Sequence, residues 1–180
     1  MRTLRSAAMP LAAVLLLSAQ AALVEPASAQ GQPAARPKCD SAEYRQFDFW
    51  VGDWDVTTGG KPAGTNLVTL EEGGCVIHEH WVGAEGGTGQ SFNFYDRSDG
   101  NWHQMWVSNS GNMLYLAGSY TDGTLTFRGE RKQADGTRLM HRLSFHPNPD
   151  RSVRQFWEIS SDGGATWTSA FDGLYRKRKT

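Results

Sequence analysis

The sequence predicts an all-β protein, an antiparallel up-and-down β-barrel of about ten strands. Short β-prone runs follow one another, hairpin-length turns separate them, and Asp-Gly pairs in those turns are typical of β-hairpins. Parallel strands need long crossovers, so short turns indicate antiparallel pairing, and closure into a barrel removes the exposed edges. A β-sandwich is the alternative. The predicted strands are 47–57, 65–71, 75–82, 90–97, 101–108, 112–121, 124–131, 137–146, 153–160 and 166–176.

The N-terminal residues indicate export. Arg2 and Arg5 precede a short apolar stretch at 10–24, and small residues at 27–29 form a cleavage motif. We therefore expect a Sec-type signal peptide, cleaved after Ala29. A retained membrane anchor is the alternative, but the apolar run is shorter than the ~20 residues that a spanning helix needs. The mature chain is predicted to be periplasmic or secreted, with no transmembrane segment.

The domain organisation follows from this assignment. Residues 1–29 are the signal peptide, 30–42 are a Pro- and Gln-rich arm expected to be disordered, and 43–178 form the barrel domain. Cleavage changes the formal net charge from −1 to −2, because the signal peptide holds two arginines and one glutamate. A net charge this close to zero does not favour nucleic acid as a partner, and it predicts no oligomeric state.

Cys39 and Cys75 are the two cysteines of the chain. An even pair in an exported protein is most simply a disulfide, here one that ties the N-terminal arm to a strand. A catalytic thiol is the alternative, but Cys75 lies in an apolar strand pattern.

The Gly52-Asp53-Trp54 motif resembles the Gly-x-Trp pattern of calycin barrels, which include lipocalins, fatty-acid-binding proteins, avidins and nitrobindin-like proteins. The resemblance implies that Trp54 closes one barrel end and that a basic residue near the C-terminus lies across its ring. Arg176 is the expected residue, with Arg178 second. The longer strings "FDFWVGDWDV", "GGCVIHEHW" and "FDGLY" resemble a family of bacterial exported proteins of unassigned function with a lipocalin-like barrel.

One turn resembles a different class of protein. The string "SSDGGATW" at 160–167 fits the Asp-box hairpin of sialidase-like propellers. A propeller needs several such repeats and this chain has one, so we interpret it as a rigid hairpin in which Asp162 accepts hydrogen bonds from its own turn.

The string "HEHW" at 78–81 holds the most suggestive polar side chains. His78 and His80 lie two residues apart, so on a strand they share a face, as metal ligands would. Glu79 points to the opposite face, and inside the barrel it would need a partner. Solvated histidines and a structural ion pair are the alternatives. The candidate partners of Glu79 are Arg128, Arg142 and Arg154.

Aromatic residues are abundant, with seven Trp, five Tyr and eight Phe, and polar side chains interrupt them on several strands. A solid core needs no interior amide groups, whereas a cavity for an apolar or aromatic molecule needs a few polar groups to orient the bound molecule. We therefore favour a binding protein for such a molecule over an enzyme, and expect no cofactor. The alternatives are an enzyme or a zinc or haem protein using His78, His80 or His141. The predicted ligand-binding residues are Glu79, Trp81, Trp102, Gln104, Trp106, Arg142 and Trp157.

Overall fold

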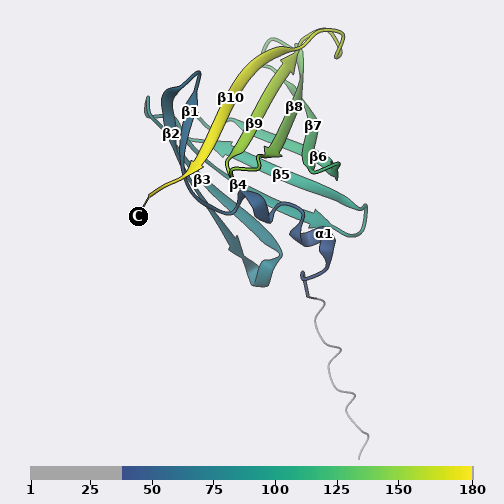
Figure 1. Cartoon of the computed structure of the whole chain (residues 1–180). Helices are drawn as coiled ribbons and strands as arrows, with labels where there is room; N and C mark the ends of the chain where they lie inside the picture. The colour runs from purple at the N-terminus through teal and green to yellow at the C-terminus, as the bar shows by residue number, and fades with distance from the viewer. Residues whose placement is uncertain (1–37, 180) are drawn as a thin grey trace, which may run out of the picture. The chain divides into compact units, whose positions relative to one another are not determined.

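In the computed structural model, residues 38–179 are described, and they contain ten antiparallel strands closed into a barrel, as predicted (Figure 1). The predicted signal peptide and most of the predicted arm lie outside the described residues. The strands are β1 (Gly52–Thr58), β2 (Lys61–Glu71), β3 (Val76–Gly83), β4 (Thr88–Asp96), β5 (Asn101–Ser108), β6 (Met113–Thr121), β7 (Thr124–Lys132), β8 (Arg138–Pro147), β9 (Val153–Ser160) and β10 (Thr168–Lys177).

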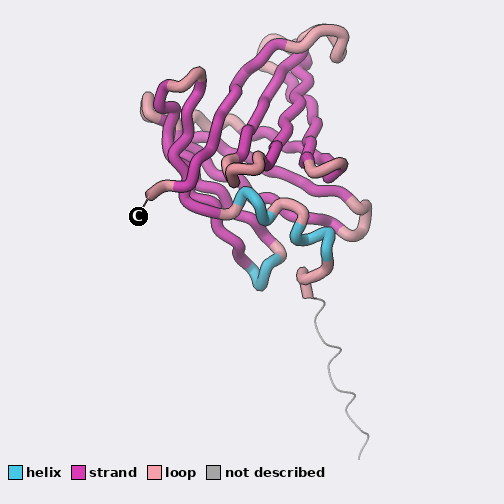
Figure 2. The backbone as a smooth tube through the Cα atoms, in the orientation of Figure 1, coloured by secondary structure: helices cyan, strands magenta, loops and turns pink. Residues whose placement is uncertain are grey.

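Each strand pairs with its neighbour in the chain, and β1 pairs with β10 to close the sheet. Short loops join the strands at both ends of the barrel (Figure 2). The turn between β6 and β7 shows how two residues can connect antiparallel strands. Asp122 and Gly123 both have positive φ, 49° and 81°, which is the backbone of a two-residue type I′ turn. Up-and-down topology therefore follows from turn chemistry repeated along the chain.

The first strand begins later than predicted. Residues 47–50 read as part of a strand because three of the four are aromatic, but η1 (Asp48–Trp50) is a 3-10 turn and β1 starts at Gly52. Aromatic residues suit a strand and a buried turn equally, so composition did not separate the two. The chain before η1 forms one short helix, α1 (Ala42–Arg45). The remaining helical turn is η2 (Glu72–Gly74), and no helix within residues 38–179 is long and apolar enough to cross a bilayer.

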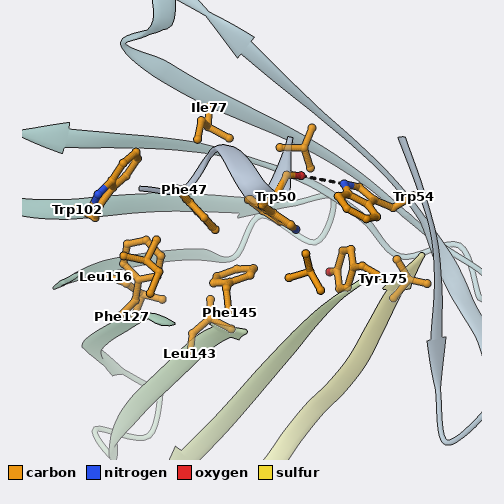
Figure 3. Packing of buried hydrophobic residues seen from close by; sticks show 14 of the residues in the cluster. Phe47, Trp50, Trp54, Ile77, Trp102, Leu116, Phe127, Leu143, Phe145 and Tyr175 are labelled. Atoms are coloured by element: carbon orange, nitrogen blue, oxygen red, sulfur yellow. Dashed lines mark hydrogen bonds between the residues drawn. The ribbon is translucent and has the colours of Figure 1, made fainter. Parts of the chain in front are cut away.

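The η1 turn fills one end of the barrel, called here the closed end. Phe47 and Trp50 are fully buried and stack on each other, with ring centroids 4.9 Å apart. Trp54 is also fully buried, and its indole Nε1 donates a hydrogen bond of 2.8 Å to the carbonyl oxygen of Trp50 (Figure 3). Phe145 from β8 packs against both Phe47 and Trp50. The chain segment before β1 is thus the plug of the barrel.

Trp54 is buried as expected, but the cation over its ring is Lys177, with Nζ 3.9 Å from the ring centroid. The expectation that Arg176 or Arg178 takes this place is therefore wrong. The strand register explains the correction, because Lys177 is the direct partner of Trp54 and shares its face, whereas Arg176 is opposite Asp55 on the other face. Arg178 pairs instead with Asp55, with 3.3 Å between Nε and Oδ1.

Gly52 has a physical role in this contact. It lies two residues before Trp54, on the same face, and its φ of 155° disfavours other residues. A Cβ added there would lie 1.8 Å from Nζ of Lys177. The glycine of the Gly-x-Trp motif therefore leaves room for the lysine that covers the tryptophan.

Two further features hold loops in place. The predicted disulfide between Cys39 and Cys75 is formed, and it links the segment before α1 to the residue before β3. Asp162 accepts hydrogen bonds from the backbone nitrogen and hydroxyl of Thr166, as the hairpin interpretation predicted. These hydrogen bonds hold the pKa of the Asp162 carboxyl well below its usual value.

We predict that Trp54→Ala lowers the free energy of unfolding by ~3–5 kcal/mol, because it removes a fully buried side chain. Lys177→Ala removes the cation–π contact and should lower it by ~1 kcal/mol. The two residues share this contact, so their effects should couple by about 0.5–2 kcal/mol in urea denaturation of a double-mutant cycle. Arg176→Ala, a change in the neighbouring cation, is the control and should be additive with Trp54→Ala. If Trp54 coupled equally to Lys177 and to Arg176, the assignment of Lys177 as the cation over the indole would be contradicted.

Candidate ligand-binding cavity

The barrel interior is filled at the closed end and hollow beyond it. A cavity of about 240 Å³ lies among side chains from six strands, β3, β5, β6, β8, β9 and β10. Leu114 and Leu143 contribute aliphatic surface on β6 and β8. Four aromatic side chains form most of the remaining wall: Trp81, Trp106, Trp157 and Phe171.

Three strands build this site with the same alternation. On β3, β5 and β9 the inward positions run from a buried apolar residue at the closed end, through a polar residue, to a tryptophan. The barrel interior is therefore layered, with an apolar plug, a polar layer and an aromatic layer toward the opposite end. The three series are Ile77-Glu79-Trp81, Trp102-Gln104-Trp106 and Val153-Gln155-Trp157.

Glycines on neighbouring strands make room for the indoles. A Cβ added at Gly89 would lie 2.2 Å from Cζ2 of Trp106, so this ring lies across the β4 backbone. A Cβ added at Gly64 would lie 2.8 Å from Cζ2 of Trp81, so that ring lies across β2. Both indoles thus contact glycines of the barrel wall and also line the cavity.

Glu79 is the buried carboxyl group of the polar layer, with 4 % of its surface exposed. The amide of Asn66 donates to its Oε1 at 2.8 Å, and the hydroxyl of Ser91 donates to its Oε2 at 2.6 Å. Asn93 donates to Ser91 and accepts from Gln104, which extends the hydrogen bonds across β2, β3, β4 and β5. These partners are neutral, so the expected ion pair of Glu79 with an arginine is wrong.

Burial raises the pKa of Glu79 to about 7, and the hydrogen bonds from Ser91 and Asn66 oppose this shift only in part. The carboxyl group therefore changes its protonation state near neutral pH. The Asn66 amide suits both states: its Nδ2 donates to the carboxylate, and a rotated amide would accept the proton of the acid through Oδ1, which is buried without a partner.

Tyr175 and Gln155 complete the polar layer on β10 and β9. The Tyr175 hydroxyl donates to Oε1 of Gln155. Burial raises the pKa of Tyr175 well above its usual value, so the phenol stays neutral at physiological pH. Among residues 38–179, no lysine, arginine or histidine lines the cavity, and Glu79 is the side chain there that can carry charge near neutral pH.

The cavity wall contains five of the seven residues predicted to bind ligand: Glu79, Trp81, Gln104, Trp106 and Trp157. Their contact with a ligand stays a prediction. The prediction missed Leu114, Leu143, Gln155, Phe171 and Tyr175. The sequence could have identified Gln155, because strand alternation places it on the same face as Trp157. It could not have identified the leucines and the other aromatic residues, because such residues occur in the plug and in the cavity alike.

The other two predicted residues lie elsewhere. Trp102 is two residues closer to the closed end than Gln104, where its Nε1 donates to Oε1 of Gln46 and its ring packs on Phe47. Arg142 alternates with Leu143 and lies on the outer face, where it forms two hydrogen bonds of 2.7 and 2.9 Å with Glu158.

The remaining candidate partners of Glu79 also lie outside the cavity. Arg128 is opposite Arg142 in the strand register and shares its outward face. Arg154 pairs with Asp172, with Nε 2.7 Å from Oδ1. Each arginine occupies the outward position in the alternation of its strand, so none can reach the carboxyl group inside.

His78 and His80 lie on the outer face of β3. His78 contacts Glu71 and Gln90 through its two ring nitrogens and stacks on Phe92, while His80 is exposed. Because neighbouring residues of a strand point to opposite faces, these histidines cannot act on a substrate together with Glu79. The structure therefore agrees with the alternation predicted from the sequence, which placed Glu79 on the face opposite to the two histidines.

His141 is an inward residue of β8 with 6 % of its surface exposed. Its Nδ1 accepts a hydrogen bond of 3.1 Å from Nε1 of Trp157, so the neutral ring carries its proton on Nε2. Burial lowers the pKa of His141 and keeps the ring neutral. Haem iron needs the lone pair of an imidazole nitrogen, and in this arrangement neither nitrogen offers one. The observed surroundings of His141 therefore do not fit a haem ligand.

Within residues 38–179, the side chains that could together hold a metal ion are Asp96, Asp99 and His103. This group lies around the β4–β5 turn, outside the cavity. Asp96 and Asp99 accept backbone hydrogen bonds from Ser98 and Asn101, so the carboxylates already stabilise the turn. His78, His80 and His141 belong to no such group among these residues.

No protein-family model and no curated protein matches this chain, so the interpretation of the cavity rests on its own geometry.

We predict that Glu79 makes the protein less stable as pH rises. In the unfolded chain the carboxyl group loses its proton near its ordinary value of 4.5, whereas in the folded protein it keeps the proton until about pH 7. The stabilisation is therefore fully present below pH 4.5 and is lost as pH rises to 7, a decrease on the order of 3 kcal/mol. Glu79→Gln should remove this decrease.

The measurement is urea denaturation of both proteins between pH 4.5 and 8. Other groups titrate equally in the two proteins, so the difference between the two stability curves isolates Glu79. Parallel curves would show that the carboxyl group keeps an ordinary pKa.

Proposed function

We propose that this protein binds a small molecule with a flat, apolar body inside its barrel. The observation that carries the proposal is the cavity of about 240 Å³, which has aromatic walls and a few polar groups gathered on one side. Such a combination is typical of ligand sites, in which apolar walls provide affinity and a few polar groups set orientation. A barrel filled solidly by its aromatic residues would have left no such space.

The size and shape of the cavity limit the ligand. Pockets for drug-sized molecules measure roughly 300–1,000 Å³, so a cavity of about 240 Å³ suits a smaller body. The indole faces of Trp81 and Trp106 suit a planar ring system, since offset or edge-to-face aromatic pairs are favourable. A fused bicyclic molecule with one polar substituent fits this description.

We also propose that binding takes place outside the cytoplasm. The disulfide between Cys39 and Cys75 supports this, because disulfides persist in oxidising compartments. The signal peptide predicted at residues 1–29 supports it independently.

The test uses naphthylmethanol, a neutral bicyclic alcohol, in isothermal titration calorimetry. The unaltered protein should bind it, and Leu114→Phe, which fills part of the cavity, should weaken binding about tenfold or more. Met113→Phe introduces the same side chain at the adjacent outward position, which is exposed, and is the matched control. It should leave the affinity unchanged.

Absence of binding to the unaltered protein would contradict the proposal. Equal weakening by the two phenylalanine variants would also contradict it, because the outer position cannot reduce the cavity. Circular dichroism of each variant confirms that the barrel is folded.

A further inference from the structure

We propose that the cavity selects a ligand that carries a protonated amine, with Glu79 as its counter-ion and the surrounding indoles as its cage. This inference rests on the proposed function and adds the chemical class of the ligand's polar group. Three features of the cavity support it: the sign of its ionisable group, the hydrogen-bond acceptors of the polar layer, and the aromatic surface above that layer.

The first feature is charge. Glu79 is the carboxyl group that lines the cavity, and among residues 38–179 no cationic side chain lines it. Its two hydrogen bonds, from Asn66 and Ser91, occupy about half of the roughly four lone-pair sites of a carboxylate. A ligand ammonium group would supply the missing positive charge, whereas a ligand carboxylate would meet like charge in a low-dielectric site.

The second feature is the set of acceptors. Tyr175 uses its hydroxyl proton in the bond to Gln155, so its oxygen acts as an acceptor, and a ligand donor would share it with the Asn66 amide. Gln104 donates to Asn93 through Nε2, which leaves its Oε1 as an acceptor. Together with the carboxyl group of Glu79, the polar layer offers three acceptors, and a primary ammonium group has three N–H donors.

The third feature is the aromatic surface. Trp81, Trp106 and Trp157 all line the cavity, each two residues beyond a polar residue of the layer below. The rings of Trp81 and Trp106 lie across glycines of neighbouring strands. Indole faces attract cations most strongly in desolvated sites, and aromatic cages of this kind recognise ammonium groups.

The protonation of Glu79 then couples to binding. The carboxyl group has a pKa of about 7 in the empty cavity, and a nearby ammonium would favour the carboxylate and release the proton. Two titratable groups near it keep their charge in this range: burial raises the pKa of Tyr175, and burial together with the nearby Arg131 lowers that of His141. His78 lies on the outer face of β3, and its charge is the smallest of the causes that lower the pKa of Glu79.

The test compares three ligands that share one naphthyl body: naphthylmethylamine, naphthylmethanol and naphthoate. At pH 7.5 the amine should bind about 30-fold or more tightly than the alcohol, and naphthoate should bind most weakly. Glu79→Gln should reduce the affinity for the amine about tenfold or more and leave that for the alcohol within about threefold. Glu85→Gln removes the same charge from an exposed loop residue and is the matched control.

Calorimetry in two buffers of different ionisation enthalpy provides a second measurement. At pH 7 the amine should release about half a proton from the unaltered protein and none from Glu79→Gln. Its affinity should rise between pH 6 and 8.

The outcomes separate this inference from the proposed function. Equal affinity for alcohol and amine, or tighter binding of naphthoate, would overturn the amine assignment and leave the binding function standing. A loss of amine affinity in Glu85→Gln equal to that in Glu79→Gln would also overturn it. If none of the three compounds binds, both proposals fall.

Discussion

The burial of Phe47 and Trp50 inside the end of the barrel is the contact on which the rest of the structure depends. A closed ten-stranded sheet encloses an interior that its own side chains must fill or leave open. The η1 turn fills one end, where its rings pack on Phe145 and its backbone accepts the Trp54 hydrogen bond. Because the plug comes from the chain just before β1, no comparable segment within residues 38–179 enters the opposite end, and the cavity remains there.

The polar layer separates this plug from the cavity. Asn66, Ser91, Asn93 and Gln104 are buried, and hydrogen bonds link them to one another or to Glu79. Burying such groups is unfavourable unless they find partners, and here hydrogen bonds across four strands satisfy them except for Oδ1 of Asn66. The layer thus supports Glu79 in a fixed position while the low dielectric around it holds the pKa near neutrality. A rigid support of this kind is what a site for a small ligand requires.

Lys177 shows how a local pattern and the closed sheet combine. The Gly-x-Trp spacing places Gly52 and Trp54 on one face of β1, which any strand would do. The cation that covers the indole is chosen by the pairing of β1 with β10, since the direct partner of Trp54 shares its side of the sheet. A shift of one residue in that register would have placed Arg176 over the ring, so the basic C-terminal string alone could not identify the cation.

The sequence by itself determined the strand count, the antiparallel order, the disulfide and which residues of β3, β5 and β9 share a face, because turn chemistry and two-residue alternation are local properties, whereas the tertiary structure decided which of the two faces points inward. Only the tertiary structure decided that Trp102 belongs to the plug while Gln104 and Trp106 line the cavity, because alternation gives the face of a residue and not its depth. It also decided that the partners of Glu79 are Asn66 and Ser91 and that the arginines stay outside. Those contacts join residues 12 or more positions apart, and the closure of the barrel sets their registers.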